Sequence, residues 1–195
     1  IIALIANLAI LRILDKSFGN FKTILYLFAF LPMLIDFGIN SSLTKYVAEF
    51  GKKRFKEAKY VIVWFLKIRF FSYFLLVLII LFFKDSLAFY FLKGISLSDL
   101  VIAGALFTLL SVFNTFSFIV LGFQNIKIFS LYQFLTSVSS VLLALLLSPL
   151  GIFYMIIGWS LGPLIANIPN LIFILEKNIF KDFKKVDMRR IFFKF

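Results

Sequence analysis

The chain has 195 residues, of which 63% are hydrophobic and 29 are phenylalanine, and its formal net charge is +12. A soluble domain of this length cannot hide so much apolar surface, so the composition excludes a soluble fold and predicts a membrane protein. Cysteine and histidine are both absent from the sequence. This excludes the commonest metal clusters and nucleophile–base pairs, so we expect a protein that is not an enzyme and needs no cofactor.

Long apolar runs predict an all-α, polytopic membrane protein with six transmembrane helices. A helix needs about 20 residues to cross a hydrocarbon core of about 30 Å. A β-barrel is excluded because runs such as residues 138–147 do not alternate apolar and polar side chains. The first run is too short to span alone and the chain begins with Ile, so we expect a truncated first helix. The predicted spans are residues 1–13, 22–39, 60–83, 97–123, 128–147 and 152–175.

The second predicted span ends at Gly38, where we expect the helix to break. The residues after the break place apolar side chains at i, i+3, i+4 and i+7, on one face of a helix: Leu43, Tyr46, Val47 and Phe50. This spacing predicts an amphipathic helix that lies in the inner headgroup region or extends the second span obliquely. Gly51 is expected to end it.

The fifth and sixth predicted spans carry small residues at four-residue spacing, which lets two membrane helices approach closely. These residues are Ser140, Ala144 and Ser148 in the fifth span, and Gly158, Gly162 and Ala166 in the sixth. The short segments 124–127 and 149–151 are expected to be tight turns. Pro163 and Pro169 are expected to bend the sixth span.

Basic residues gather in alternate connections between the spans. The loop after the second span, the turn after the fourth and the tail after the sixth together hold 14 of the 21 lysines and arginines. By the positive-inside rule this bias predicts a cytoplasmic N-terminus and a cytoplasmic tail in a multi-pass protein of the plasma membrane. The basic loops are expected to meet anionic lipid headgroups, and we expect no nucleic-acid partner.

Residues 11–51 resemble the oligosaccharide and polysaccharide (O-antigen flippase-like) transporters of the multidrug/oligosaccharidyl-lipid/polysaccharide exporter superfamily. That family has an Arg-Leu-Leu-like element, then Tyr-Gly or Phe-Gly, and after the second span Gly-Leu-x-x-x-Leu-x-Arg-Tyr-x-Ala-Glu. The matching segments are Arg12-Ile-Leu, Phe18-Gly19 and Gly38-Ile-Asn-Ser-Ser-Leu-Thr-Lys-Tyr-Val-Ala-Glu49. Lys45 stands in place of the usual arginine, which keeps the charge and loses the planar guanidinium.

The resemblance implies that residues 1–190 form the six-helix N-terminal lobe of a two-lobed, MATE-like transporter. Residues 176–195 are then a basic cytoplasmic linker to a seventh helix outside the chain. Such proteins translocate lipid-linked sugars to the outer leaflet by alternating access. The implied partners are membrane lipids, an oligosaccharide linked to polyprenyl phosphate or polyprenyl pyrophosphate, and a C-terminal lobe of the same protein.

Basic residues inside the spans are the candidates for contact with the substrate. They are Arg12, Lys67 and Arg69. A guanidinium at mid-bilayer costs about 2.5–3.5 kcal/mol on insertion scales, so such a residue usually faces a cavity or a partner. Arg12 has the alternative of reaching the outer interface or pairing with Asp15. Lys67 and Arg69 are two residues apart, so they point to different helix faces; one is expected to line the path while the other extends toward the interface.

Asp36 is the one carboxylate within an apolar run. An ion-coupled transporter needs such a group, so Asp36 is a candidate for ion coupling. The plainer interpretation is an acid at the inner end of its helix, paired with a nearby lysine. Asn114, Gln133, Asn167 and Asn170 are interpreted as partners in hydrogen bonds between helices.

The sequence therefore predicts a flippase for a lipid-linked oligosaccharide or polysaccharide precursor. Two alternatives remain open at this point. One is an ion-coupled multidrug exporter of the same superfamily, which a buried Asp36 in the cavity would favour. The other is a non-transporting membrane scaffold for envelope assembly, which a lobe without a polar cavity would favour.

Overall fold

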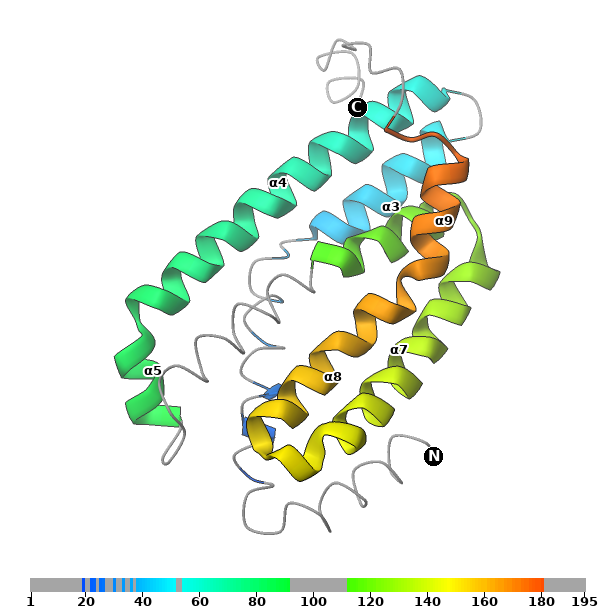
Figure 1. Ribbon diagram of the computed structural model, residues 1–195. Coiled ribbons are helices and arrows are strands. Elements are labelled where there is room, and N and C mark those ends of the chain that lie inside the picture. The colour runs from blue at the N-terminus through cyan, green and yellow to red at the C-terminus, as the bar shows by residue number, and fades with distance from the viewer. Residues whose placement is uncertain are drawn as a thin grey trace.

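In the computed structural model of the chain, the described residues are 19, 22–23, 25–26, 30, 33, 36, 38–51, 54–91 and 112–180. The regular elements among them are all helical, which confirms the predicted all-α membrane fold (Figure 1). In chain order they are α3 (Ile39–Phe50), α4 (Phe55–Phe82), α5 (Lys84–Phe91), a helix over Val112–Gly122, α7 (Ile126–Leu147), the short 3-10 helix η2 (Ser148–Leu150), α8 (Ile152–Ala166) and α9 (Ile168–Glu176).

Three helical stretches in the described part of the chain are long and apolar enough to cross a membrane. They are Phe55–Phe82, Ile126–Leu150 and Ile152–Glu176. These stretches correspond to the predicted third, fifth and sixth spans, and Val112–Gly122 is the described part of the fourth. The predicted first span and residues 181–195 lie outside the described residues, so the limits of the lobe and of its linker stay predictions.

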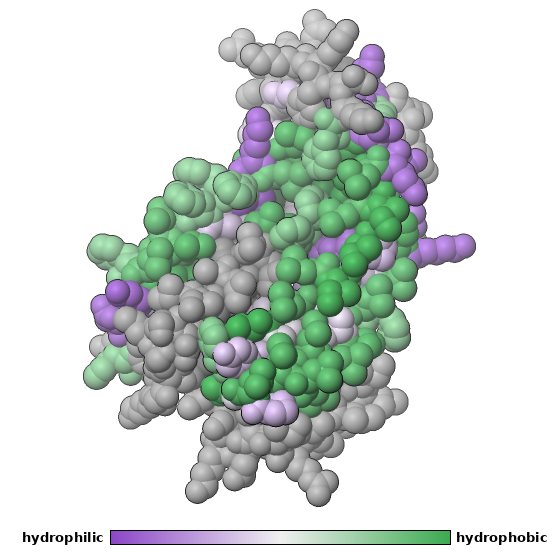
Figure 2. All heavy atoms as spheres, viewed as in Figure 1, coloured by the Kyte–Doolittle hydropathy of each residue, from purple (hydrophilic) through white to green (hydrophobic). Residues whose placement is uncertain are grey.

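Large apolar side chains cover much of the described surface (Figure 2). On α4 alone, Phe70, Phe71, Phe74 and Phe82 are each more than half exposed. Such a surface is costly in water and suits hydrocarbon. On the same view, hydrophilic residues gather toward the end where α9 stops, with a smaller group beside α5. The helices therefore present apolar sides between polar ends, as expected of a bundle that crosses a bilayer.

The small residues of α7 and α8 bring these two helices into close contact, as the spacing predicts. A methyl group added at Gly158 would overlap the backbone of Leu143 and Ala144, and one at Gly162 would overlap Ser140. The hydroxyl of Ser139 lies 2.9 Å from the carbonyl oxygen of Gly162. This approach leaves no space for a larger side chain at either glycine, so the two glycines set the distance between the helices.

The predicted bend in the sixth span is confirmed as a break between α8 and α9 at Asn167. Pro163 lies inside α8 and Pro169 lies at the start of α9. Proline lacks the N–H that a continuous helix needs, which frees backbone carbonyls near the break. At the break, the side-chain amide of Asn167 donates to the carbonyl oxygen of Pro163 at 2.9 Å, and the same carbonyl accepts the backbone N–H of Asn167 at 3.1 Å.

A hydrophobic core joins α3, α4, the helix Val112–Gly122 and α9 at one end of the molecule (Figure 1). The predicted break at Gly38 is confirmed, because this residue has a left-handed φ of 74° at the start of α3. The apolar face of α3 is also confirmed: Leu43, Val47 and Phe50 are buried. These side chains pack on α4 and Val112–Gly122 inside this core. Whether α3 lies in the inner headgroup region or extends the second span obliquely stays a prediction.

Candidate functional site

Arg69 is buried near the middle of α4, the longest described helix, which has 28 residues. Its side chain is only 3% exposed. A helix of this length rises about 42 Å, so its middle lies well inside a hydrocarbon core of about 30 Å. Among its polar neighbours on α4, Ser72 is already engaged, because its hydroxyl donates to the carbonyl oxygen of Ile68 at 2.9 Å. The guanidinium must therefore find a charged partner on another element.

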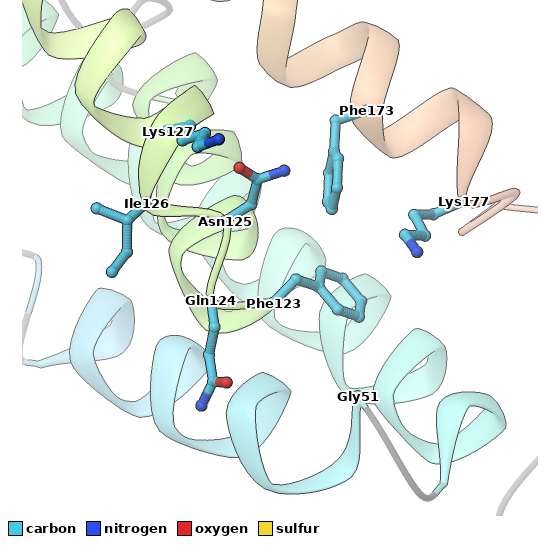
Figure 3. A pocket seen from close by; sticks show the side chains of 8 residues that line it. All are labelled: Gly51, Phe123, Gln124, Asn125, Ile126, Lys127, Phe173 and Lys177. Carbon is cyan, nitrogen blue, oxygen red and sulfur yellow. The ribbon is translucent and has the colours of Figure 1, made fainter.

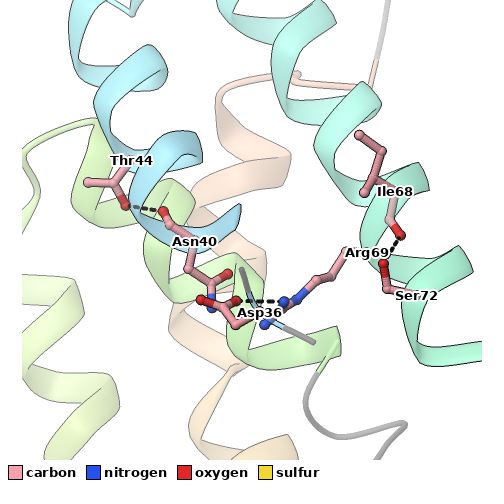
Figure 4. Close-up of polar contacts among 6 residues, drawn as sticks. All are labelled: Asp36, Asn40, Thr44, Ile68, Arg69 and Ser72. Atoms are coloured by element: carbon pink, nitrogen blue, oxygen red, sulfur yellow. Dashed lines mark hydrogen bonds and ion pairs between the residues drawn. The ribbon is translucent and has the colours of Figure 1, made fainter. Parts of the chain in front are cut away.

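The main partner of Arg69 is Asp36, which precedes α3 in the chain. The Nη1 atom of Arg69 lies 2.6 Å from Oδ1 of Asp36, whose side chain is 27% exposed (Figure 4). The guanidinium also lies over the ring of Tyr73, 4.7 Å from its centroid and one turn further along α4. Opposite charge and the face of an aromatic ring both stabilise a cation that is removed from water.

The hydrogen-bonding capacity of this cluster is not used up. The Nε atom of Arg69 and the Oδ1 atom of Asn40 are buried and have no hydrogen-bond partner among the described residues. Asn40 is 8% exposed and lies beside Asp36 in Figure 4. A buried donor without a partner costs about 1–3 kcal/mol. The site therefore holds a buried cationic N–H group without a hydrogen-bond partner among the described residues.

Lys67 points to a different face of α4 from Arg69, as the two-residue spacing predicts. Its side chain is exposed, and so are those of Trp64 and Phe71, which lie three and four residues away on the same face. Lys67 therefore projects from an apolar outer face and is not brought together with the Asp36–Arg69 pair. Its long chain can carry the ammonium along the helix toward the nearer interface.

The remaining predicted site residues have separate outcomes. Arg12 lies outside the described residues, so its role stays a prediction. The expectation that Asp36 pairs with a lysine is wrong, because its partner is Arg69. A signal for this pair was present in the sequence: opposite charges in two neighbouring apolar runs lower their cost by pairing. Because the two residues are far apart in the sequence, the contact between them was not predicted.

A second polar cluster joins the helix Val112–Gly122 to α7. The hydroxyl of Tyr132 donates to Oδ1 of Asn114 at 3.0 Å, and the hydroxyl of Ser117 donates to the carbonyl oxygen of Asn114 at 2.8 Å. The predicted interhelical role of Asn114 is thus confirmed. Asn170 instead donates to Asn167 at 2.9 Å, across the break between α8 and α9. The hydrogen bonds of Asn114 and Asn170 hold parts of the bundle together, so we interpret them as packing contacts and not as ligand contacts.

Acidic side chains do not cluster in the described part of the chain. No group of three His, Cys, Asp or Glu residues there is arranged to hold a metal ion. The polar groups of the site around Arg69 are a guanidinium, a carboxylate and an amide, and they lie in an apolar bundle. These groups can bind and exchange an anion without a covalent step.

Comparison with known proteins gives one match. The family model described as "Polysaccharide biosynthesis protein" matches residues 1–195 of the chain. No curated protein and no solved structure matches it significantly. The match covers the segment 11–51 that carries the resemblance and continues through all the described helices.

Proposed function

The chain belongs to the polysaccharide biosynthesis protein family, and we propose that it is the N-terminal lobe of a flippase for a lipid-linked oligosaccharide. The observation that carries this proposal is the family match over residues 1–195. Membership indicates a membrane protein with a role in polysaccharide transport or flipping. The direction of movement, from the cytoplasmic to the outer leaflet, and the plasma membrane location belong to the proposal.

The chemistry of such a substrate defines what the protein must supply. A polyprenyl chain can stay in the hydrocarbon, whereas the phosphate or pyrophosphate and its sugars cannot cross it unaided. A transporter therefore needs a cationic group inside the bundle that binds the anion and later releases it. Arginine suits this task because its planar guanidinium binds phosphate through two parallel hydrogen bonds.

Arg69 is the described residue that fits this requirement best. It is buried, it lies near the middle of a candidate span, and its Nε atom has no hydrogen-bond partner in the part of the chain that the structure describes. In the proposed mechanism Asp36 compensates the guanidinium while the site is empty, and the anionic headgroup replaces Asp36 when substrate arrives. When the partner of the buried guanidinium changes from Asp36 to the substrate, the free energies of the empty and the loaded protein change by different amounts in the two conformations of the lobes. This difference couples substrate binding to the rocking of the lobes.

The test compares two basic residues of the same helix. Cells that lack the gene are supplied with the full protein carrying Arg69→Gln or, as a matched control, Lys67→Gln. The measurement is the fraction of lipid-linked oligosaccharide that a membrane-impermeant glycosidase can reach. We expect accumulation on the protected cytoplasmic face with Arg69→Gln and rescue with Lys67→Gln, because only Arg69 is buried with an acidic partner.

A further variant separates loss of transport from loss of folding. Arg69→Gln leaves Asp36 without its partner, whereas the double variant Asp36→Asn/Arg69→Gln replaces the ion pair with neutral groups of similar size. Both proteins are checked for their amount in the membrane. Normal sidedness with a well-expressed double variant would contradict the role of Arg69, and normal sidedness in cells without the gene would contradict the flippase.

The two alternatives gain no support from the site. An ion-coupled exporter would use Asp36 as its coupling carboxylate, but the pair with Arg69 already gives this carboxylate a partner. A non-transporting scaffold has no need for a buried guanidinium with an unused donor. Both stay predictions, and unchanged sidedness in the experiment above would favour them.

A further inference from the structure

A basic pocket lies at the end of the molecule where the turn after Val112–Gly122 meets the end of α9 (Figure 3). Its volume is about 750 Å³, which is within the range of about 300–1,000 Å³ that small-ligand sites occupy. The residues that matter for its chemistry are Phe123, Asn125, Lys127, Phe173 and Lys177. Neither Asp36 nor Arg69 lines this pocket, and it plays no part in the proposed transport step.

The polar lining of the pocket is cationic. Lys127 comes from the first turn of α7 and Lys177 follows the last residue of α9, and none of the described residues that line the pocket is acidic. The Oδ1 atom of Asn125 accepts a hydrogen bond from the N–H of Ile128 at 3.2 Å, which caps α7. In Figure 3 the side chain of Asn125 points toward Phe173, so its amide N–H groups face the same space. The positive end of the α7 dipole adds to this attraction for anions.

The other wall of the pocket is aromatic. The rings of Phe123 and Phe173 lie 5.8 Å apart between centroids, and the Nζ atom of Lys177 lies 5.7 Å from the centroid of Phe173. On its far side, Phe123 also contacts Phe55 at the start of α4, at 6.0 Å. The pocket therefore offers ammonium groups beside an apolar surface, which matches a ligand with a charged head and an apolar body.

The position of the pocket identifies the source of such a ligand. It lies where the candidate spans Ile126–Leu150 and Ile152–Glu176 respectively begin and end. The ends of membrane-spanning helices lie at the level of the lipid headgroups. An anionic phospholipid places its phosphate at this depth and its glycerol and acyl chains directly beneath.

We propose that this pocket binds the headgroup of an anionic bilayer phospholipid. The phosphate contacts Lys127 and Lys177, with the amide of Asn125 as a further donor, and the glycerol backbone lies against Phe123 and Phe173. Charge complementarity, headgroup depth and the aromatic wall all favour this occupant. The bound lipid would join the turn before α7 to the end of α9, two segments that are about 50 residues apart in the chain.

Lipid retention by the purified full protein tests the proposal. The protein is titrated with phosphatidylglycerol or phosphatidylcholine in neutral detergent, and bound lipid is counted by native mass spectrometry. We expect phosphatidylglycerol to be retained in preference to phosphatidylcholine. The variant Lys127→Gln/Lys177→Gln should weaken the binding of phosphatidylglycerol about tenfold or more, because it removes two charge-assisted contacts.

Matched variants distinguish this pocket from a general effect of charge. Lys45→Gln/Lys56→Gln removes the same charge from exposed residues at the same end of the molecule and should leave binding unchanged. Lys127→Arg/Lys177→Arg keeps the charge in the pocket and should retain the lipid. Equal losses in both glutamine variants, or equal retention of the two lipids by the wild type, would overturn the proposal.

A competition arm separates the phospholipid from the transported substrate. Polyprenyl-pyrophosphate-linked sugar is added to protein already loaded with phosphatidylglycerol. We expect phosphatidylglycerol to stay bound to the protein when the sugar lipid is added. We also expect the wild type to bind the sugar lipid and the Arg69→Gln variant not to bind it. If the sugar lipid displaces phosphatidylglycerol from the wild type, and this displacement requires Lys127 and Lys177, the pocket belongs to the substrate and the proposal is overturned. Because the readout is bound lipid, failure of the flippase hypothesis leaves this test intact.

Discussion

At the scale of single residues, the Asp36–Arg69 pair is the most unusual feature of the bundle. The two charges are 2.6 Å apart, and they join α4 to the segment before α3. Removing water from both charges is costly, and their attraction offsets that cost only while both are present. The pair is therefore expected to be sensitive to the loss of either partner and tolerant of the loss of both.

This reasoning predicts the outcome of a double-mutant cycle. Asp36→Asn leaves a buried guanidinium without its carboxylate and should destabilise the protein by about 3–5 kcal/mol. Arg69→Gln should cost less, because Asp36 is partly exposed and can reach water. The double variant should be more stable than the sum of the single effects predicts. Unfolding in detergent measures all three, with Lys67→Gln as a control expected within about 0.5 kcal/mol of the wild type. Strictly additive effects would show that the pair has no coupling energy.

At the scale of helices, the contact of α7 with α8 depends on two glycines. The two helices lie too close for a methyl group at Gly158. A Cβ atom added there would lie 2.9 Å from the backbone nitrogen of Ala144, which is less than a normal contact distance. The obstruction is backbone and not a flexible side chain, so it cannot be relieved by a rotamer change. The two helices would have to move apart to accept a larger residue.

Gly158→Ala and Gly162→Ala should each destabilise the protein by about 1–3 kcal/mol through overpacking. Gly19→Ala is the matched control, because no atom lies within 4 Å of a Cβ added there. Alanine also favours the helical state over glycine, so this control should be neutral or stabilising. The midpoint of thermal unfolding in detergent orders the three variants. A result in which Gly158→Ala is as stable as Gly19→Ala would contradict the close packing.

At the scale of the whole molecule, the structure explains why the basic loops were predicted to lie on one side. The starts of α4 and α7 and the end of α9 meet around Phe55, Phe123 and Phe173. Arg54, Lys56, Lys127 and Lys177 all lie at that end. The opposite end carries the turn η2 and the junction of α4 with α5. By the positive-inside rule, we predict that the basic end lies on the cytoplasmic side.

The orientation can be measured directly because the chain has no cysteine. We expect a cysteine introduced by Ser86→Cys in α5 to react with a membrane-impermeant maleimide in intact cells. A cysteine introduced by Lys56→Cys should react only after the membrane is permeabilised. Both positions are exposed, so reactivity reports the side of the membrane and not burial. The reversed pattern would contradict the predicted topology.

Local sequence patterns predicted the local structure well. The break at Gly38, the turn near residue 124 and the small-residue contact of α7 with α8 all follow from residues close together in the chain. The partner of Asp36 was missed because Arg69 is 33 residues away and the preference for a lysine rested on the nearest loop. The residues that cover the apolar face of α3 could not be predicted, because an amphipathic pattern indicates an apolar face but not whether lipid or protein covers it.

The basic pocket was also beyond the reach of the sequence. Its lysines belong to a turn and to a helix end about 50 residues apart, and only the fold brings them to one space. The sequence counted Lys127 with the turn after the fourth span and Lys177 with the tail, whereas the structure places Lys127 in the first turn of α7 and Lys177 at the end of α9. The sequence gives the charge of each segment, whereas the pocket depends on the end of α9 lying next to the start of α7.

The most direct test of the central claim is movement of the substrate across a membrane by the purified full protein. The protein is reconstituted into vesicles that contain a polyprenyl-pyrophosphate-linked oligosaccharide, with proton and sodium gradients imposed in separate arms. An impermeant glycosidase reports how fast the protected sugar becomes accessible. The flippase account predicts faster exposure with the wild type than in protein-free vesicles, and a return to the protein-free rate with Arg69→Gln. Equal rates with and without the wild-type protein in every arm would contradict it.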